Sequence, residues 1–401
     1  MSANIFEKVT DCVFDTCKTV GKKLNIILGP NMLDFTKLFE EVGLCNKSKL
    51  YPRLYDYEFD EYCKSYIFKC PVGLSTHDFE KVLAQIAHFV GVDEKDIRIK
   101  RKGFDIEVKV ITKVPKAEYD METMKRRDFK IPLGYSMDTM ELVYWDIVKN
   151  SNTHCYIAGS SGGGKSITLR LILCHLVNSK SKRDIEFSII NTKRVDLKEF
   201  EKCKHTRHYM TGSEGAEAFL EEELEEMERR YRLLEKHDCD DLTEYRKKVD
   251  RIPYRLIVVE EISSYKDNKE YQRAIELIAS QGRGAGMILL LVTQLPSREI
   301  MPNTIKCNIN TTIGLKTKDE IRSDIIVPDG ELHKLKGDGH AKLFDSKHDG
   351  AEYQGLYISK ETMKEIINNN LRQNKRAIEA GTSITQGDST ENDKSILSPQ
   401  L

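Results

Sequence analysis

Residues Gly159–Ser166, which read GSSGGGKS, have the spacing of a phosphate-binding loop. An apolar run, Cys155–Ala158, precedes them and regularly spaced apolar residues follow them, so the sequence predicts a strand, a Gly-rich turn and the start of a helix. The backbone N–H groups of such a turn close around phosphates, and the helix N-terminus adds partial positive charge. We therefore expect this stretch to bind ATP.

The lysine and the serine at the helix start have defined tasks in this motif. Lys165 is expected to reach the β- and γ-phosphates, and Ser166 is expected to place its hydroxyl on Mg²⁺. The residues predicted to surround the nucleotide are Gly159, Ser160, Ser161, Gly162, Gly163, Gly164, Lys165, Ser166 and Ile167.

Polar residues at the ends of two later apolar runs supply the second half of a hydrolytic site. The run Leu256–Val259 ends in Glu260 and Glu261, which suits one acid for the Mg²⁺ shell and one that orients the attacking water. The next apolar run ends in Thr293 and Gln294. We expect Glu260 to hold the metal, Glu261 to act in catalysis, and Gln294 to sense the γ-phosphate.

The composition is that of a globular protein, with 32% charged and 39% hydrophobic residues in a chain of 401. This length favours two or three domains. The formal net charge of −1 does not indicate a polyanion partner, although 63 Lys and Arg residues allow a local basic surface. Ten cysteines without a C-x-x-C pair favour reduced thiols. Since we find no signal peptide and no apolar run of membrane length, we expect a cytoplasmic protein without its own transmembrane segment.

One cluster has metal-like residue types, namely Cys203, His205 and His208 in KCKHTRH. No second pair of ligands lies at the spacing of a zinc finger. We therefore interpret these three residues as structural, and Mg²⁺ is the metal that the sequence predicts.

The chain divides into four segments by composition and periodicity. Residues 1–48 have a weakly amphipathic helical pattern, and residues 49–130 predict a small α/β domain. From 131 to 370, strands and helices alternate, which predicts a mostly parallel sheet with helices on both faces. Residues 371–401 are polar and poor in aromatic side chains, which predicts a disordered tail. The strands expected in the large domain are 155–158, 185–191, 255–260 and 287–293.

A long helix is predicted over residues 218–236, which read AFLEEELEEMERRYRLLEK. Its apolar residues form one stripe, so this side is expected to face the core. We interpret its many glutamates as a solvated face with i,i+4 pairing to Arg230 and Arg232.

Several stretches over residues 131–345 resemble, in order, the motor domain of the FtsK/SpoIIIE family of DNA translocases. The entry to the loop, THCYIAGSSGGGKS, is similar to that of the family, as is IINTKRVDLKEF after the second strand. EMERRY, GRGAGMILLLVTQLPS, IKCNINTTIGLKTKDEIRSDIIV and LKGDGHAKLF also match family patterns. Within the family, the chain looks most like TcpA-type coupling proteins of Gram-positive conjugative elements.

The resemblance implies a RecA-like P-loop NTPase, of α/β class, preceded by the small α/β domain. It implies assembly into a ring, usually a hexamer, around double-stranded DNA, with ATP between subunits and an arginine of the neighbour reaching the γ-phosphate. Arg283 and Arg322 match arginines of the family pattern, and either is a candidate for this catalytic finger. Relaxase or membrane channel components would be further partners, and they would bring the protein to the inner face of the membrane.

Three departures from the family pattern bear on function. Members commonly carry Asp and then Glu at the end of the Walker B strand, whereas this chain has Glu260 and Glu261. The transmembrane helices that are frequent in the family are missing, and so is a winged-helix module after the motor. Slower hydrolysis and no orientation by a chromosomal sequence are expected.

The favoured function is therefore an ATP-driven translocase of double-stranded DNA that serves transfer or maintenance of a mobile element. Basic loops would face the DNA, and Arg298 and Lys306 are candidates. Two alternatives stay open: an ATPase that moves protein, and an ATP-binding switch that does not hydrolyse ATP and recruits partners.

Overall fold

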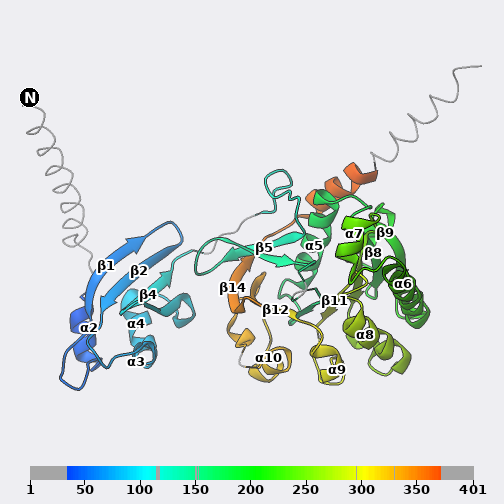
Figure 1. Ribbon diagram of the computed structural model, residues 1–401. Coiled ribbons are helices and arrows are strands. Elements are labelled where there is room, and N and C mark those ends of the chain that lie inside the picture. Colours follow the sequence, from blue (N-terminus) through cyan, green and yellow to red (C-terminus); the bar gives the residue numbers. More distant parts are fainter. Residues whose placement is uncertain are drawn as a thin grey trace, which may run out of the picture. The chain divides into compact units, whose positions relative to one another are not determined.

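The computed structural model describes residues 34–371, apart from 114–117, 150, 152, 295 and 329. The chain forms two compact units that divide between residues 114 and 115 (Figure 1). The predicted disordered tail, 371–401, lies outside the described residues except for Leu371, and so does most of the predicted helical segment 1–48.

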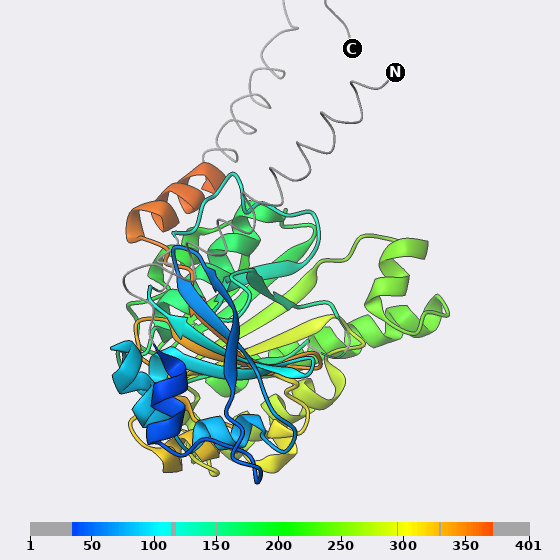
Figure 2. The same cartoon turned by 90° about the vertical axis from the view of Figure 1, so that its left-hand side faces the viewer.

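The first unit is a four-stranded antiparallel sheet in the order β1-β2-β4-β3, with helices against one face (Figure 2). Phe35 and Phe39 of the helix α2 lie against Phe68 and Phe79, so this helix shares the core of the sheet. The elements are β1 (Arg53–Phe59), β2 (Cys63–Lys69), β3 (Ile97–Lys102), β4 (Asp105–Ile111), α2 (Phe35–Glu41), α3 (Thr76–Glu80), α4 (Leu83–Val90) and the 3-10 helix η1 (Glu94–Asp96).

The second unit is built on a ten-stranded sheet in the order β6-β5-β14-β13-β12-β7-β11-β10-β8-β9. The strands from β12 to β9 in this order are parallel, and the remaining ones pair antiparallel. The strands are β5 (Lys130–Ser136), β6 (Leu142–Asp146), β7 (Cys155–Ala158), β8 (Ile185–Asn191), β9 (Thr206–Thr211), β10 (Tyr254–Glu260), β11 (Met287–Thr293), β12 (Thr311–Leu315), β13 (His340–Phe344) and β14 (Asp349–Gly355).

Helices cover both faces of this sheet, as a parallel sheet requires. The helices are α5 (Lys165–Ser179), α6 (Ala216–Lys236), α7 (Leu242–Lys248), α8 (Lys269–Gln281), α9 (Asn303–Lys306), α10 (Glu320–Ile326), residues 360–371, and the 3-10 helices η2 (Lys198–Lys202), η3 (Ile262–Tyr265) and η4 (Leu332–Lys334).

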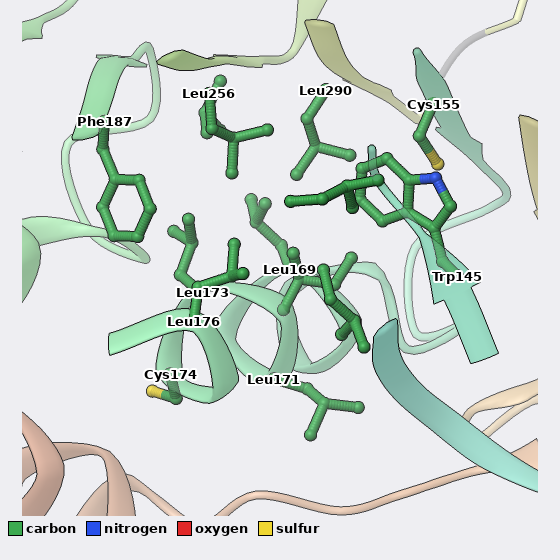
Figure 3. Packing of buried hydrophobic residues seen from close by; sticks show 14 of the residues in the cluster. Trp145, Cys155, Leu169, Leu171, Leu173, Cys174, Leu176, Phe187, Leu256 and Leu290 are labelled. Carbon is green, nitrogen blue, oxygen red and sulfur yellow. The ribbon is translucent and has the colours of Figure 1, made fainter. Parts of the chain in front are cut away.

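Alternate residues of the central strands face two separate cores. In β10, Leu256 and Val258 belong to one core with α5 and residues 360–371, whereas Ile257 and Val259 belong to the other with α6 and α8. Figure 3 shows the first core, where Leu169, Leu173 and Leu176 of α5 lie beneath Leu256 and Leu290, with Trp145 beside Cys155. The predicted mostly parallel sheet with helices on both faces is thus confirmed.

The interpretation of the long helix is wrong for one glutamate. Glu223 of α6 is buried, and its carboxylate accepts hydrogen bonds from Ser188 Oγ at 2.5 Å and Arg255 Nη1 at 3.0 Å. His208 Nδ1 lies 2.8 Å from the same carboxylate. Arg230, which pairs with a glutamate one turn earlier as expected, is also buried. The helix therefore places an ion pair inside the second core, next to β8 and β10.

Replacing Glu223 by Ala should leave the Arg255 guanidinium buried without its counter-charge. A broken buried pair costs about 3–5 kcal/mol, so we expect a loss of that size in the free energy of unfolding. Urea unfolding can be followed through Trp145, the single tryptophan, which is buried in the second unit.

The matched control is Glu222→Ala on the same helix, because the Glu222 side chain is 63% exposed. It should change the free energy of unfolding by less than about 0.5 kcal/mol. Equal effects of the two substitutions would show that the buried pair is not stabilising the unit.

Candidate active site

The phosphate-binding loop lies between the carboxyl end of β7 and the first turn of α5, as predicted. Gly162 and Gly164 have φ of 79° and 110°, a left-handed conformation that only glycine adopts without strain. Gly164 is the N-cap of α5, so the loop delivers its backbone directly to the helix N-terminus. The first helical residues are Lys165 and Ser166, which stand where a phosphate group would meet them.

The loop is held from outside by two neighbouring segments. Ser160 N donates to Lys316 O at 2.8 Å, just after β12, and Gly339 N donates to Gly163 O at 3.2 Å. A Cβ atom on Gly159 would lie 2.7 Å from Leu315 Cβ, and one on Gly164 would lie 2.8 Å from Gly339 Cα. Both glycines are therefore required by packing, and Gly164 is required by its backbone conformation as well.

The Lys165 ammonium group is buried beside its own loop. Its Nζ donates to Gly159 O at 2.7 Å and to Ser160 O at 2.6 Å. Burial lowers the pKa of Lys165 to about 8, and the positive charge of Lys193 acts in the same direction. A phosphate that takes the place of the two carbonyl groups would supply full negative charge and would favour the charged amine.

Glu260 is the last residue of β10 and is 2% exposed. Burial raises its pKa to about 7, against a weaker lowering effect of Lys193. Its Oε1 lies 3.9 Å from Lys193 Nζ, whereas Oε2 is buried and has no hydrogen-bond partner in the described part of the chain. A buried carboxylate oxygen without a partner is costly, so this arrangement fits a divalent cation, for which carboxylate and hydroxyl oxygens are suitable ligands.

Glu261 is held in a different environment from its neighbour. It has a φ of 58°, and its carboxylate accepts hydrogen bonds from Ser263 Oγ at 2.5 Å, Thr293 Oγ1 at 2.9 Å and Gln294 N at 3.2 Å. Burial alone would raise the pKa of Glu261, but these hydrogen bonds together bring it below its usual value. The carboxylate is therefore ionised, and it ties the end of β10 to the end of β11.

Two residues that the sequence reasoning did not assign belong to this site. Asp196 Oδ2 accepts a hydrogen bond from Ser166 Oγ at 2.6 Å, and Lys193 Nζ lies 3.3 Å from Glu261 Oε2. Both follow β8, in the stretch IINTKRVDLKEF. Their position directly after a predicted parallel strand could have indicated this, because β8 pairs in parallel with β10 and the segments after both strands leave the sheet at the same edge.

The two candidate arginines lie at different edges of the sheet. Arg322 is in α10, which follows β12 at the edge of the sheet where the phosphate loop lies. Its guanidinium group pairs with Asp319. Arg283 lies in the turn before β11, which is the opposite edge. The seven residues of β11 span roughly 20 Å, so Arg283 does not reach Lys165 of its own chain. A role of either arginine in a neighbouring site stays a prediction.

The other residues singled out in the sequence have these surroundings. Cys203 Sγ lies 3.7 Å from His205 Nδ1, but His208 is bound to Glu223 instead. Within the described ranges, no group of three or more His, Cys, Asp or Glu side chains is placed to hold a metal. Arg298 is exposed beyond β11, whereas Lys306 Nζ donates to Ile325 O at 3.0 Å.

No helix among the residues described in the structure is both long and apolar enough to cross a bilayer.

A phosphate loop between a central parallel strand and a helix, with carboxylates at the end of the strand two places away, defines a RecA-like P-loop ATPase fold. More particularly, residues 116–295 match the model of the FtsK/SpoIIIE family, and this part of the chain is an FtsK/SpoIIIE domain.

Curated relatives include the DNA translocase FtsK of Borreliella burgdorferi, 30% identical over 225 residues, which are 53% of this chain and 28% of the relative. The DNA translocase FtsK of Staphylococcus aureus is 27% identical over 235 residues, or 55% of this chain and 30% of the relative. The chain thus spans about three tenths of the length of these relatives.

Solved structures share the fold over more of the chain. The pCW3 conjugation coupling protein TcpA, in its monomer form with ATPγS, has a TM-score of 0.59 at 19% identity, over 84% of this chain and 97% of TcpA. EssC (ATPases 2 and 3) from Geobacillus thermodenitrificans has a TM-score of 0.58 at 15% identity, over 67% of this chain and 53% of that one. These structures confirm the predicted fold class, and the predicted family agrees with the family model that matches residues 116–295.

Glu260 makes the stability of the nucleotide-free protein depend on pH. Its pKa is raised from 4.5 to about 7, so the folded protein holds a proton that the unfolded chain releases between these two values. The stabilising contribution is complete below pH 4.5 and is lost as pH rises to 7. Relative to Glu260→Gln, the wild type should lose about 2–3 kcal/mol in free energy of unfolding across this window.

Urea unfolding of both proteins at several pH values, without Mg²⁺, measures this difference. A constant difference from pH 4.5 to 8 would show that the Glu260 carboxyl is not desolvated in the folded state.

Proposed function

We propose that this chain is an ATP-driven translocase of double-stranded DNA. The observation that carries the proposal is the FtsK/SpoIIIE domain at residues 116–295, in which the loop lysine, the loop serine and two strand-end glutamates all lie at one edge of the sheet. Curated relatives of this domain have the name DNA translocase. The geometry of the loop supports ATP as the source of energy, and the names of the relatives support DNA as the substrate.

The loop would bind the phosphates of ATP with its backbone N–H groups and the N-terminus of α5. Lys165 would exchange its two carbonyl partners for phosphate oxygens. Ser166 and Glu260 would hold Mg²⁺, and Glu260 has an unpartnered buried oxygen for this purpose. When bound, the cation neutralises charge on the phosphates.

Glu261 has the properties of the residue that orients the attacking water. Its carboxylate is ionised and held by hydrogen bonds from Thr293 and the Gln294 N–H, so it could accept a hydrogen bond from the attacking water without moving. Through the same hydrogen bonds, hydrolysis would be coupled to Gln294, which directly follows β11. Gln294 and this segment would pass the change on to the surface that contacts DNA.

The assembly that suits this function is a ring, with a hexamer as the expected form and ATP between subunits. A neighbour would bring Arg283 or Arg322 to the γ-phosphate, and the finger would offset charge in the transition state. The likeness of its fold to a conjugation coupling protein supports a role in the transfer or maintenance of a mobile element. Relaxase or channel components would then be its partners and would recruit the protein to the membrane.

A second function, movement of a protein cargo, is favoured by one observation. The cytoplasmic domain of the Thermomonospora curvata type VII secretion ATPase EccC shares the fold with a TM-score of 0.55, close to that of TcpA. A third candidate is an ATP-dependent assembly switch, because Glu260 stands where the family commonly has Asp.

ATP hydrolysis should rise strongly, by about tenfold or more, when linear duplex DNA is added to the purified protein. Lys165→Ala should abolish hydrolysis with and without DNA, because it removes the charge that meets the β- and γ-phosphates. A coupled phosphate-release assay measures both.

Hydrolysis that is indifferent to DNA would favour the protein cargo. ATP binding without hydrolysis would favour the switch, and Glu260→Asp should then restore turnover.

Affinity for duplex DNA should fall steeply with salt and depend weakly on sequence. Contacts to phosphates release counterions, so a site with six to ten of them loses about 10³–10⁵ in affinity between 50 and 200 mM salt. Fluorescence anisotropy with two unrelated duplexes tests this, and a flat salt response would contradict a basic channel around DNA.

A further inference from the structure

The loop that follows β8, residues 192–196, contacts both halves of the candidate active site. Thr192 Oγ1 donates to Glu260 O at 2.5 Å, and Lys193 Nζ lies 3.3 Å from Glu261 Oε2. At the other end of the loop, the Asp196 carboxylate accepts a hydrogen bond from the Ser166 hydroxyl group. The loop therefore connects the strand-end glutamates to the first turn of α5.

The hydrogen bond between Ser166 and Asp196 determines what the serine offers to a ligand. A hydroxyl group has one proton and two lone pairs. Because the proton is donated to Asp196 Oδ2 at 2.6 Å, the lone pairs of Ser166 Oγ point away from the aspartate. A hydroxyl in this state can accept from a donor or ligate a cation, but it does not donate to a phosphate.

Asp196 also adds negative charge to the surroundings of Glu260. The two residues are connected through the loop, since Thr192 Oγ1 donates to Glu260 O and Asp196 lies four residues further on. The carboxylates of Asp196 and Glu260 and the hydroxyl group of Ser166 thus belong to one site. Lys193 is the cationic side chain beside Glu260 and Glu261. Mg²⁺ keeps several of its waters in protein sites, and these waters need acceptors.

We propose that Asp196 is a further carboxylate of the divalent cation site. It holds the Ser166 hydroxyl with its lone pairs toward the cation, and its negative charge stabilises the hydrated ion. This inference rests on one part of the proposed function only, namely that the loop binds a nucleotide together with a divalent cation. It does not depend on DNA or on the assembly.

The experiment is calorimetric binding of ADP, in Mg²⁺ and in EDTA, to the full chain and three variants. Asp196→Asn keeps an oxygen that can accept from Ser166 but removes the charge, whereas Asp196→Ala removes both. Glu201→Gln is the control, because Glu201 is exposed a few residues further along the same segment. Trp145 fluorescence checks that each variant is folded.

For the wild type, Mg²⁺ should tighten ADP binding. Asp196→Asn and Asp196→Ala should both reduce this Mg²⁺-dependent gain at least about fivefold, and both should bind ADP in EDTA within about twofold of the wild type. Glu201→Gln should behave as the wild type in both buffers.

Other results would overturn the inference in distinguishable ways. A full Mg²⁺ effect in Asp196→Asn, with a loss only in Asp196→Ala, would reduce Asp196 to a hydrogen-bond acceptor for Ser166. Weak ADP binding by both variants in EDTA as well would show a general structural role. A wild type that does not bind ADP in either buffer would refute the nucleotide site, and with it the proposed function.

Discussion

The parallel pairing of β7 with β11 and β12 is the constraint on which the rest of the candidate site depends. It places the carboxyl ends of these strands, and of β10 and β8 beyond them, on one edge of the sheet. The loop lysine, the strand-end glutamates and the loop after β8 gather there because each leaves its strand at that edge. The two hydrophobic cores keep the strands in register and thereby keep these charges within reach of one another.

Burial gives the charges at this edge their particular character. Lys165 and Glu260 are both buried, which favours the neutral form of each side chain. The pKa of Lys165 is lowered to about 8, and that of Glu260 is raised to about 7. Glu261 stays ionised because hydrogen bonds compensate for its burial. Two adjacent glutamates thus differ in charge state, because one is buried without hydrogen-bond partners for one of its oxygens and the other accepts several hydrogen bonds. A bound nucleotide and cation would supply the countercharges that the protein alone leaves incomplete.

Much of the fold could be predicted because buried parallel strands are continuous apolar runs. Three of the four expected strands, β7, β8 and β11, have the predicted bounds, and β10 begins one residue earlier. The loop could be predicted because its glycines and lysine are consecutive in the chain. The antiparallel part of the sheet was not specified, since it consists of two hairpins, β5–β6 and β13–β14, that are far apart in the chain and meet only through the pairing of β14 with β5.

The missed side chains were missed for a physical reason in each case. Asp196 and Lys193 lie in an irregular loop, where no periodicity connects them to Ser166 or Glu261. Glu223 was interpreted as solvated from its charge, although it falls on the same face of α6 as Leu220 and Met227. The helical spacing was informative there, and the residue type was misleading.

The contact between Gly164 and Gly339 joins two segments that are far apart in the chain. Neither has a side chain that could yield, and Gly339 is bound on its other side, where its carbonyl accepts from Gly355 N at 2.9 Å. The backbone of the turn before β13 therefore packs directly against the phosphate loop. A side chain at Gly164 would collide with this backbone, because its Cβ would lie 2.8 Å from Gly339 Cα. The turn thus restricts position 164 of the loop to glycine by the position of its backbone alone.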